Sequence, residues 1–135
     1  MFIENNYRAV RVAGSGIMEY ADCDLIAGRA EKGKKFCVEV KSGKKLSIYI
    51  SKKQIENFII FSDIFGLKPV IATRFNRFGW FFINPKHLKS TGKSFVVNIK
   101  TARKKGKRFS QFFGWDYINF IFLIQHLQSL INYQA

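Results

Sequence analysis

The order of strand-like and helix-like segments predicts an α/β sandwich, in which a mixed sheet is flanked by helices. Short apolar runs bounded by glycines and charged residues come first, a strongly apolar helix follows them, and further strands precede a closing helix. With 135 residues, 47% of them hydrophobic, the chain can bury one core without crosslinks. We therefore expect a single domain over residues 1–135.

Four segments in the first third of the chain have the composition of strands. They cover residues 7–12, 23–27, 36–40 and 46–50. The stretch GRAEKGKK joins the second segment to the third, and its glycines and charges predict a hairpin loop.

The clearest helix is predicted to begin after Ser51 and to end at Gly66, because Ser51 and Gln54 have the spacing of a capping box and Gly66 suits a C-terminal stop. One stripe of this helix is formed by Ile55, Phe58, Ile59, Ser62 and Phe65. Apolar residues outside that stripe are Ile60, Phe61 and Ile64. A helix that is apolar on two sides lies inside a core or faces a second subunit.

The second half of the chain continues the mixed pattern. Strands are predicted at residues 69–75, 79–83 and 95–99, with a turn at residues 76–77 between the first two. A basic run, residues 100–108, precedes the last helix, which we expect to begin at Asp116 and to end near Ile131.

The charge of the chain points to a polyanionic partner. Lys and Arg number 23 against 9 acidic residues, giving a net charge of +14, whereas a magnitude of about 2–8 keeps a small domain soluble. Nucleic acid is favoured over a membrane surface or an acidic protein. The longest apolar stretch is too short to span a bilayer, no secretory signal is evident, and the 2 cysteines lack metal-site spacing. We therefore expect a soluble, cytoplasmic protein with a nucleic-acid partner.

The predicted hairpin brings acidic residues together. If its strands pair symmetrically about the loop, Asp24 lies opposite Glu39, and directly opposed side chains share a face with Cβ atoms about 5 Å apart. Lys41 follows Glu39 on the same face, while Val38 and Val40 point into the core. Two carboxylates this close repel each other unless a cation lies between them.

This group of side chains suits metal-dependent phosphodiester hydrolysis. Asp24, Glu39 and a backbone carbonyl such as that of Val40 would hold Mg²⁺, with Mn²⁺ as an alternative. The metal would neutralise charge on the phosphate and acidify a bound water, and Lys41 would orient that water or stabilise the phosphate. The alternative is a surface hairpin with an ordinary cross-strand Asp, Glu and Lys.

These residues resemble the PD-(D/E)xK nuclease pattern, with Asp24-Leu25-Ile26-Ala27-Gly28 followed by Glu39-Val40-Lys41. The preceding Val10-Arg11-Val12-Ala13-Gly14-Ser15 is similar to the archaeal-type Holliday junction resolvases of archaea and some of their viruses. The resemblance continues through Tyr49-Ile50-Ser51-Lys52-Lys53-Gln54, Phe65-Gly66, Pro69-Val70, Gly79-Trp80 and Trp115-Asp116.

The resemblance implies a restriction-endonuclease-like fold and a homodimer that nicks four-way DNA junctions. It implies that Asp24, Glu39 and Lys41 form the metal and catalytic site, assisted by Ser15 from a loop. The other implied roles are DNA contact by Arg11 and Arg74, a place beside the site for Gln54, and dimer contact by Phe61 and Phe65. Lys104 and Lys105, in the basic run, are expected to extend the DNA-binding surface.

One departure from the family pattern concerns a catalytic glutamate on an N-terminal helix. Glu4-Asn5-Asn6-Tyr7 resembles the end of that helix, so the matching position falls before Met1. We expect slow cleavage, or replacement of that acid by Glu19. Two other readings of the chain remain: another repair or restriction-type nuclease of the same fold, and a DNA-binding module with little catalytic activity.

Overall fold

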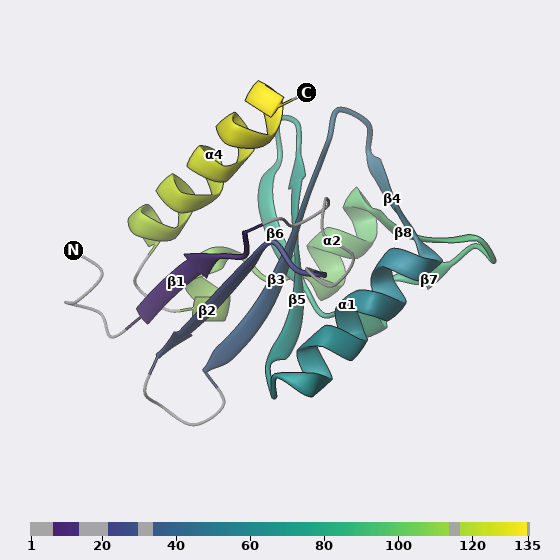
Figure 1. Cartoon of the computed structure of the whole chain (residues 1–135). Coiled ribbons are helices and arrows are strands. Elements are labelled where there is room, and N and C mark those ends of the chain that lie inside the picture. Colours follow the sequence, from purple (N-terminus) through teal and green to yellow (C-terminus); the bar gives the residue numbers. More distant parts are fainter. Residues whose placement is uncertain (1–6, 14–21, 30–33, 114–116, 135) are drawn as a thin grey trace.

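The computed structural model describes residues 7–13, 22–29, 34–113 and 117–134. Strands and helices follow one another in the mixed order that the sequence predicts (Figure 1). In chain order the elements are β1 (Tyr7–Arg11), β2 (Leu25–Arg29), β3 (Lys35–Gly43), β4 (Ser47–Ser51), α1 (Lys52–Ile64), β5 (Lys68–Phe75), β6 (Gly79–Ile83), the 3-10 turn η2 (Pro85–His87), β7 (Lys89–Ser90), β8 (Ser94–Asn98), α2 (Ile99–Lys105), α3 (Phe109–Phe113) and α4 (Tyr117–Gln134). Over these described residues, none of the helices has the length and hydrophobicity that a membrane span requires.

The main sheet is mixed, as predicted. Its 5 strands lie in the order β1-β2-β3-β5-β6. Strands β3 and β5 run parallel, and the other neighbouring pairs are antiparallel. A parallel pair needs a crossover connection, which β4 and α1 supply here.

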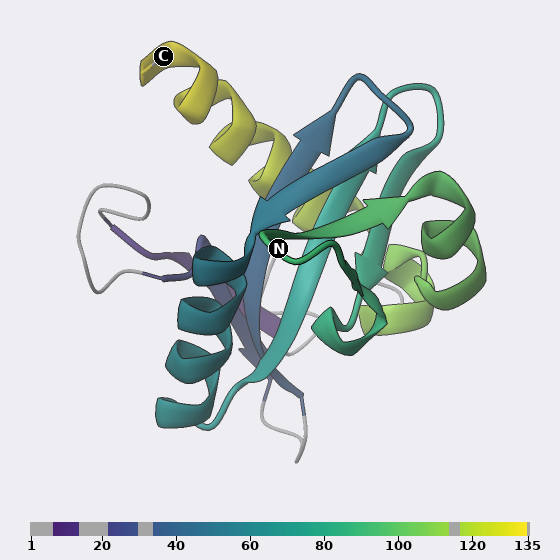
Figure 2. The same ribbon diagram turned by 90° about the vertical axis from the view of Figure 1, so that its right-hand side faces the viewer.

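A second, antiparallel sheet of 3 strands forms beside the first, in the order β4-β8-β7. The strand predicted at residues 46–50 therefore leaves the main sheet and pairs with the strand predicted at residues 95–99. Figure 2 is viewed from the side of the molecule on which this second sheet lies. Ile48 and Ile50 of β4 are buried together with Val97 of β8, so one face of the second sheet packs against the rest of the molecule.

Helix α1 has the predicted caps. The Ser51 hydroxyl accepts a hydrogen bond from the Gln54 backbone N–H at 3.2 Å. At the other end Gly66 has φ of +64°, and the Leu67 N–H donates to the Ser62 carbonyl at 2.8 Å, which is the pattern of a Schellman motif. The Gln54 side chain does not complete the capping box, because it is hydrogen-bonded to Glu39 of β3 instead.

Two apolar clusters lie on opposite faces of the main sheet. Val38 and Val40 of β3 pack with Ile124 and Leu127 of α4 on one face. Cys37, from the same strand, packs with Ile55 and Phe58 of α1 on the other. Figure 1 shows α1 and α4 on different sides of the strands. The alternation along β3 therefore gives the main sheet an α1 face and an α4 face.

The basic run of residues 100–108 contains a helix that the sequence did not lead us to expect. Helix α2 begins after Asn98, whose side-chain oxygen accepts from the Thr101 N–H at 2.8 Å. Two arginines of the run are packed against aromatic rings. The Arg103 guanidinium lies 4.8 Å from the centre of the Phe78 ring, and that of Arg108 lies 3.9 Å from the centre of the Phe81 ring.

Candidate active site

The hairpin of β2 and β3 brings Asp24 next to Glu39. Leu25 and Val38 form the last pair of the antiparallel ladder, so Asp24 and Glu39 meet where that ladder ends, and the charge of Asp24 acts on Glu39. The Asp24 N–H donates to the Val38 carbonyl at 3.1 Å. Its carboxylate oxygen Oδ2 accepts from the Val40 N–H at 2.7 Å. Strand β3 therefore holds both the backbone and the carboxylate of Asp24.

Glu39 is an ionisable side chain on the α1 face, and only 5% of its surface is exposed. Its oxygen Oε1 accepts a hydrogen bond from Gln54 Nε2 at 2.9 Å and lies 3.3 Å from Lys41 Nζ. Both of these partners use Oε1; among the described residues, none donates to Oε2. One oxygen is thus held by the protein, while the carboxylate keeps acceptor capacity for another group.

The surroundings of Glu39 favour its neutral form. Burial, followed by the negative charge of Asp24, raises the pKa of Glu39 from its ordinary value of 4.5 to about 7. Lys41 and Gln54 act in the opposite direction. A divalent cation between the two carboxylates would reverse this balance, because its charge favours the ionised form of both.

The donor set fits a hard cation that keeps part of its hydration shell. Within the described part of the chain, no three His, Cys, Asp or Glu side chains gather as metal ligands. Magnesium commonly takes one or two carboxylates, with waters and substrate phosphate filling its other positions. Asp24 and Glu39 meet that requirement, whereas a closed structural zinc site needs four protein ligands.

Two thiols lie beside these acids. Cys23 and Cys37 are free and have no exposed surface. The Cys23 thiol donates to the Leu25 carbonyl at 3.0 Å. A hydrogen bond with Cys23, together with burial, raises the pKa of the Cys37 thiol. Since the thiolate is the form that binds metals and reacts, these cysteines act as part of the core beneath the site.

Arg11 and Arg74 lie at the same end of the sheet as the acids but on its other face. Arg11 pairs with Leu25, a residue of the α4-face cluster. Arg74 pairs with Ser42, next to Lys41, and its Nη1 donates to the Gln128 side chain of α4 at 3.4 Å. The structure thus brings Asp24, Glu39, Lys41 and Gln54 together and sets these arginines apart from them.

The comparison with protein families decides the identity. A family model described as the archaeal Holliday junction resolvase, Hjc, matches residues 1–116. The chain belongs to this family.

Relatives of the resolvase family support the match. The chain is 41% identical over 95 residues to a crossover junction endodeoxyribonuclease Hjc of Methanocaldococcus jannaschii, covering 70% of this chain and 65% of that protein. It is 31% identical over 115 residues to a protein of the same name from Archaeoglobus fulgidus, covering 80% of this chain and 83% of that protein. The alignment thus spans less than two thirds of the Methanocaldococcus protein.

A solved structure has the same fold. The structure of the Holliday junction resolvase Hjc of Archaeoglobus fulgidus superposes with a TM-score of 0.71 at 28% identity, covering 82% of this chain and 89% of that chain. The restriction-endonuclease-like fold predicted from the sequence is therefore confirmed. Helix α4 begins at Tyr117, just beyond the residues that the family model matches.

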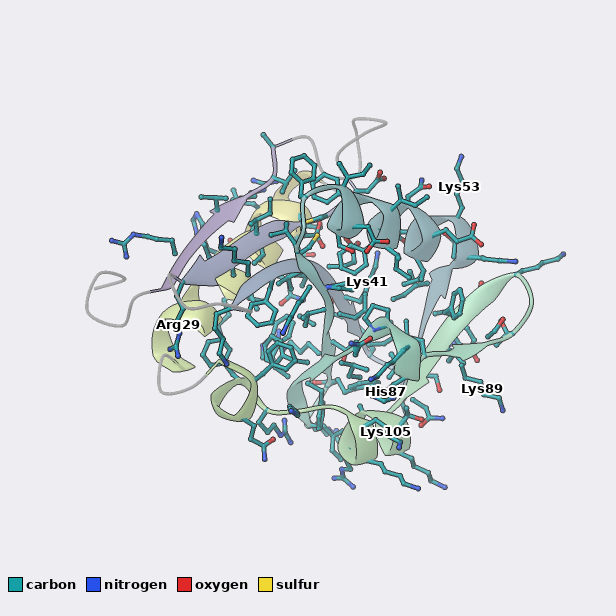
Figure 3. The ribbon with its side chains drawn as sticks, turned by 90° about the horizontal axis from the view of Figure 1, so that it is seen from below. Arg29, Lys41, Lys53, His87, Lys89 and Lys105 are labelled. Carbon is teal, nitrogen blue, oxygen red and sulfur yellow. The ribbon has the colours of Figure 1, made fainter. Side chains whose placement is uncertain are left out.

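For some predicted site residues of this resolvase-family chain, the expected role rests on the sequence alone. Ser15, Glu4 and Glu19 lie outside the described residues. Lys104 and Lys105 are exposed on α2, and Figure 3 shows Lys105 at the outside of the molecule. Sequence reasoning treated the basic run as one surface, and it missed that Arg103 and Arg108 stack on phenylalanines. The aromatic residues of the FNRFGWFF stretch are the only sequence signal for that packing.

Proposed function

We propose that this chain is a metal-dependent endonuclease that cleaves four-way DNA junctions. The observation that carries the proposal is the grouping of Asp24, Glu39 and Lys41 at one end of the sheet in a member of the resolvase family. Its relatives are named crossover junction endodeoxyribonucleases. The net charge of +14 supplies affinity for DNA phosphates.

Asp24 and Glu39 would hold Mg²⁺. Bound there, the ion would neutralise charge on the scissile phosphate and increase the acidity of water. Gln54 positions Glu39 through the hydrogen bond to Oε1. The Lys41 side chain is 26% exposed, so its amine can contact a phosphate while it remains paired with Glu39. Ser15 is proposed to assist cleavage, and Arg11 and Arg74 to hold flanking DNA.

The outer side of α1 supports a homodimer. Ile60, Ile64 and Phe65 are 56%, 74% and 60% exposed. The half-buried Phe61 stacks on Phe65 with 4.6 Å between ring centres. Exposed apolar patches of this kind mark interaction sites. Two cuts in a twofold-symmetric junction need two identical sites at a fixed separation, which a dimer provides.

The test is incubation of the protein with a four-way junction and with a linear duplex of matched sequence, each with Mg²⁺, with Mn²⁺ and with chelator. We expect nicks in the junction only, and only when metal is present. Equal cutting of the duplex would favour a repair or restriction-type nuclease. Junction binding without nicks under every metal condition would favour a DNA-binding module.

A further inference from the structure

The second sheet has an outer face whose chemistry the proposed active site does not use. On its central row, Tyr49 of β4 pairs with Val96 of β8, and Val96 pairs with Lys89 of β7. Directly paired residues share a face, so these three side chains form one row across the sheet. Tyr49 is 65% exposed, whereas its neighbours Ile48 and Ile50 are buried on the inner face.

The residues around Tyr49 leave its ring accessible. Ser47 pairs with Asn98, and Ser51 pairs with Ser94, on either side of the central row. These side chains are short and polar, so they rise little above the pleat. An aromatic ring on such a face presents a flat surface to a planar partner.

The charge around this face is positive. No acidic residue occurs between Asp63 and Asp116, a stretch that contains β7 and β8. Lys89 and Lys93 are exposed, and Figure 3 shows Lys89 pointing away from the molecule. The Lys93 carbonyl accepts from the Lys52 N–H at 3.1 Å, which places the turn that carries Lys93 beside the end of β4. Lys52 lies 3.8 Å from Glu56, whereas Lys89 and Lys93 belong to the stretch without acidic residues.

Other exposed apolar residues have a different setting. Ile60, Ile64 and Phe65 lie together at the C-terminal half of α1 and just beyond it, where a second copy of the chain would cover them. Val10 is 59% exposed on β1 and is aliphatic. Among the strand residues whose side chains the structure describes, Tyr49 is the one strongly exposed aromatic. A ring that remains in water beside lysines suits a ligand with both a π-face and negative charge.

We propose that the outer face of the second sheet is a stacking platform for an unstacked DNA base. The Tyr49 ring takes the base, and Lys89 and Lys93 hold the adjacent phosphates. Strand β4 continues into α1, whose first turn carries the Gln54 that bonds Glu39. The platform therefore adjoins the catalytic centre in the chain and would receive a strand that leaves the helical stack near a branch. This inference rests on the DNA-binding role proposed above.

The test measures binding of the whole protein to fluorescent oligo(dT) in chelator, so that no cleavage step enters. Stacking on an aromatic side chain contributes about 1–3 kcal/mol per base, which is roughly five- to 150-fold in affinity. We expect Tyr49→Ala and Tyr49→Leu to bind about tenfold or more weakly, and Tyr49→Phe to bind like the wild type. The matched control Val10→Ala, also an exposed strand residue, should bind unchanged.

The lysines give a separate readout. Lys89→Ala should lower the slope of log affinity against log salt by roughly 0.7, the value for one phosphate contact on a single strand, whereas Tyr49→Ala should leave the slope unchanged. The platform is overturned if Tyr49→Ala binds oligo(dT) like the wild type, or if Tyr49→Leu restores binding. Failure of the proposed function is distinguishable, because it appears as an absence of metal-dependent junction cleavage by the wild type.

Discussion

The two faces of the main sheet are built from the same strands but differ in chemistry. The α4 face is closed by apolar side chains, such as Val38, Val40 and Ile124. The α1 face also buries Glu39 and Thr73, of which Glu39 pairs with Ile71 and Thr73 pairs with Lys41. Burying polar groups costs free energy unless they are paired. The proposed metal site therefore lies on the α1 face, where burial of a carboxylate raises its pKa.

We expect the largest loss of junction nicking when an acid of the proposed site is replaced. Replacement of another acid on the same side of the molecule should have no effect. Asp24→Ala removes a proposed metal ligand held by the Val40 N–H. We expect a loss of junction nicking of roughly 100-fold or more, because small errors of position at a reacting centre are costly. Junction binding should be retained, since affinity comes from phosphate contacts.

Glu56→Ala is the matched control for Asp24→Ala. Glu56 is an exposed acid on α1 whose carboxylate lies 3.8 Å from the amine of Lys52, and its variant should nick at the wild-type rate. Rates are measured under single-turnover conditions with saturating enzyme. Near wild-type nicking by Asp24→Ala would show that the acids on the α1 face do not carry out cleavage.

The cost of burying Glu39 should appear as a pH dependence of stability. The pKa of Glu39 is about 7 in the folded protein, above its ordinary value of 4.5, so the folded state binds the proton more tightly. The stabilisation is complete below about 4.5 and is lost as pH rises through about 7. This loss amounts to roughly 3 kcal/mol of unfolding free energy, at 1.36 kcal/mol per pKa unit.

Glu39→Gln tests that cost directly. The variant cannot ionise, so in chelator its free energy of unfolding should fall less than that of the wild type between pH 5 and pH 8. It should be inactive as a nuclease, and Mg²⁺ should no longer raise its melting temperature. Urea denaturation at both pH values gives the difference. Parallel pH dependences for the two proteins would mean that Glu39 is not held in its neutral form.

We also expect the outer surface of α1, and not that of α4, to mediate association between two copies of the chain. Phe65→Asp places a charge in the proposed dimer contact, where it would be buried without a partner. We expect a shift from dimer to monomer in light scattering at micromolar concentration. Ile131→Asp is the control on α4, where Ile131 is 45% exposed, and its mass should stay dimeric. A monomeric wild type, or a monomer produced only by Ile131→Asp, would contradict the α1 interface.

Local patterns were enough to predict part of the site. The symmetric loop between two short strands predicted that Asp24 lies near Glu39, and Ser51 and Gly66 marked the ends of α1. The hydrogen bond from Gln54 to Glu39 joins a helix to a distant strand, and no local rule predicts it. The face that Arg74 occupies also depended on the parallel register of β5 with β3, which the sequence does not specify.

The basic run also shows what local sequence patterns cannot predict. Its charged residues have two different settings in the structure, and composition does not distinguish them. The Arg108 guanidinium donates to the Phe78 and Trp80 carbonyls at 2.8 and 2.9 Å and stacks on Phe81. Lys104 and Lys105 are exposed at the end of α2. Arginine can stack and bond as a planar fork, whereas lysine is a mobile point charge. The arginines are therefore held against phenylalanine rings, whereas Lys104 and Lys105 are exposed.

The smallest effect should follow from this division of the basic run. Reversing both lysines, Lys104→Glu with Lys105→Glu, should weaken binding to junction and duplex alike, because phosphate contacts do not read sequence. The slope of log affinity against log salt should fall by roughly 0.9 for each phosphate that the variant no longer neutralises. Arg108→Lys should instead lower the melting temperature, since an ammonium cannot replace two carbonyl bonds and a stacked ring, and it should leave the slope unchanged. An unchanged slope in the lysine variant would place α2 away from the DNA.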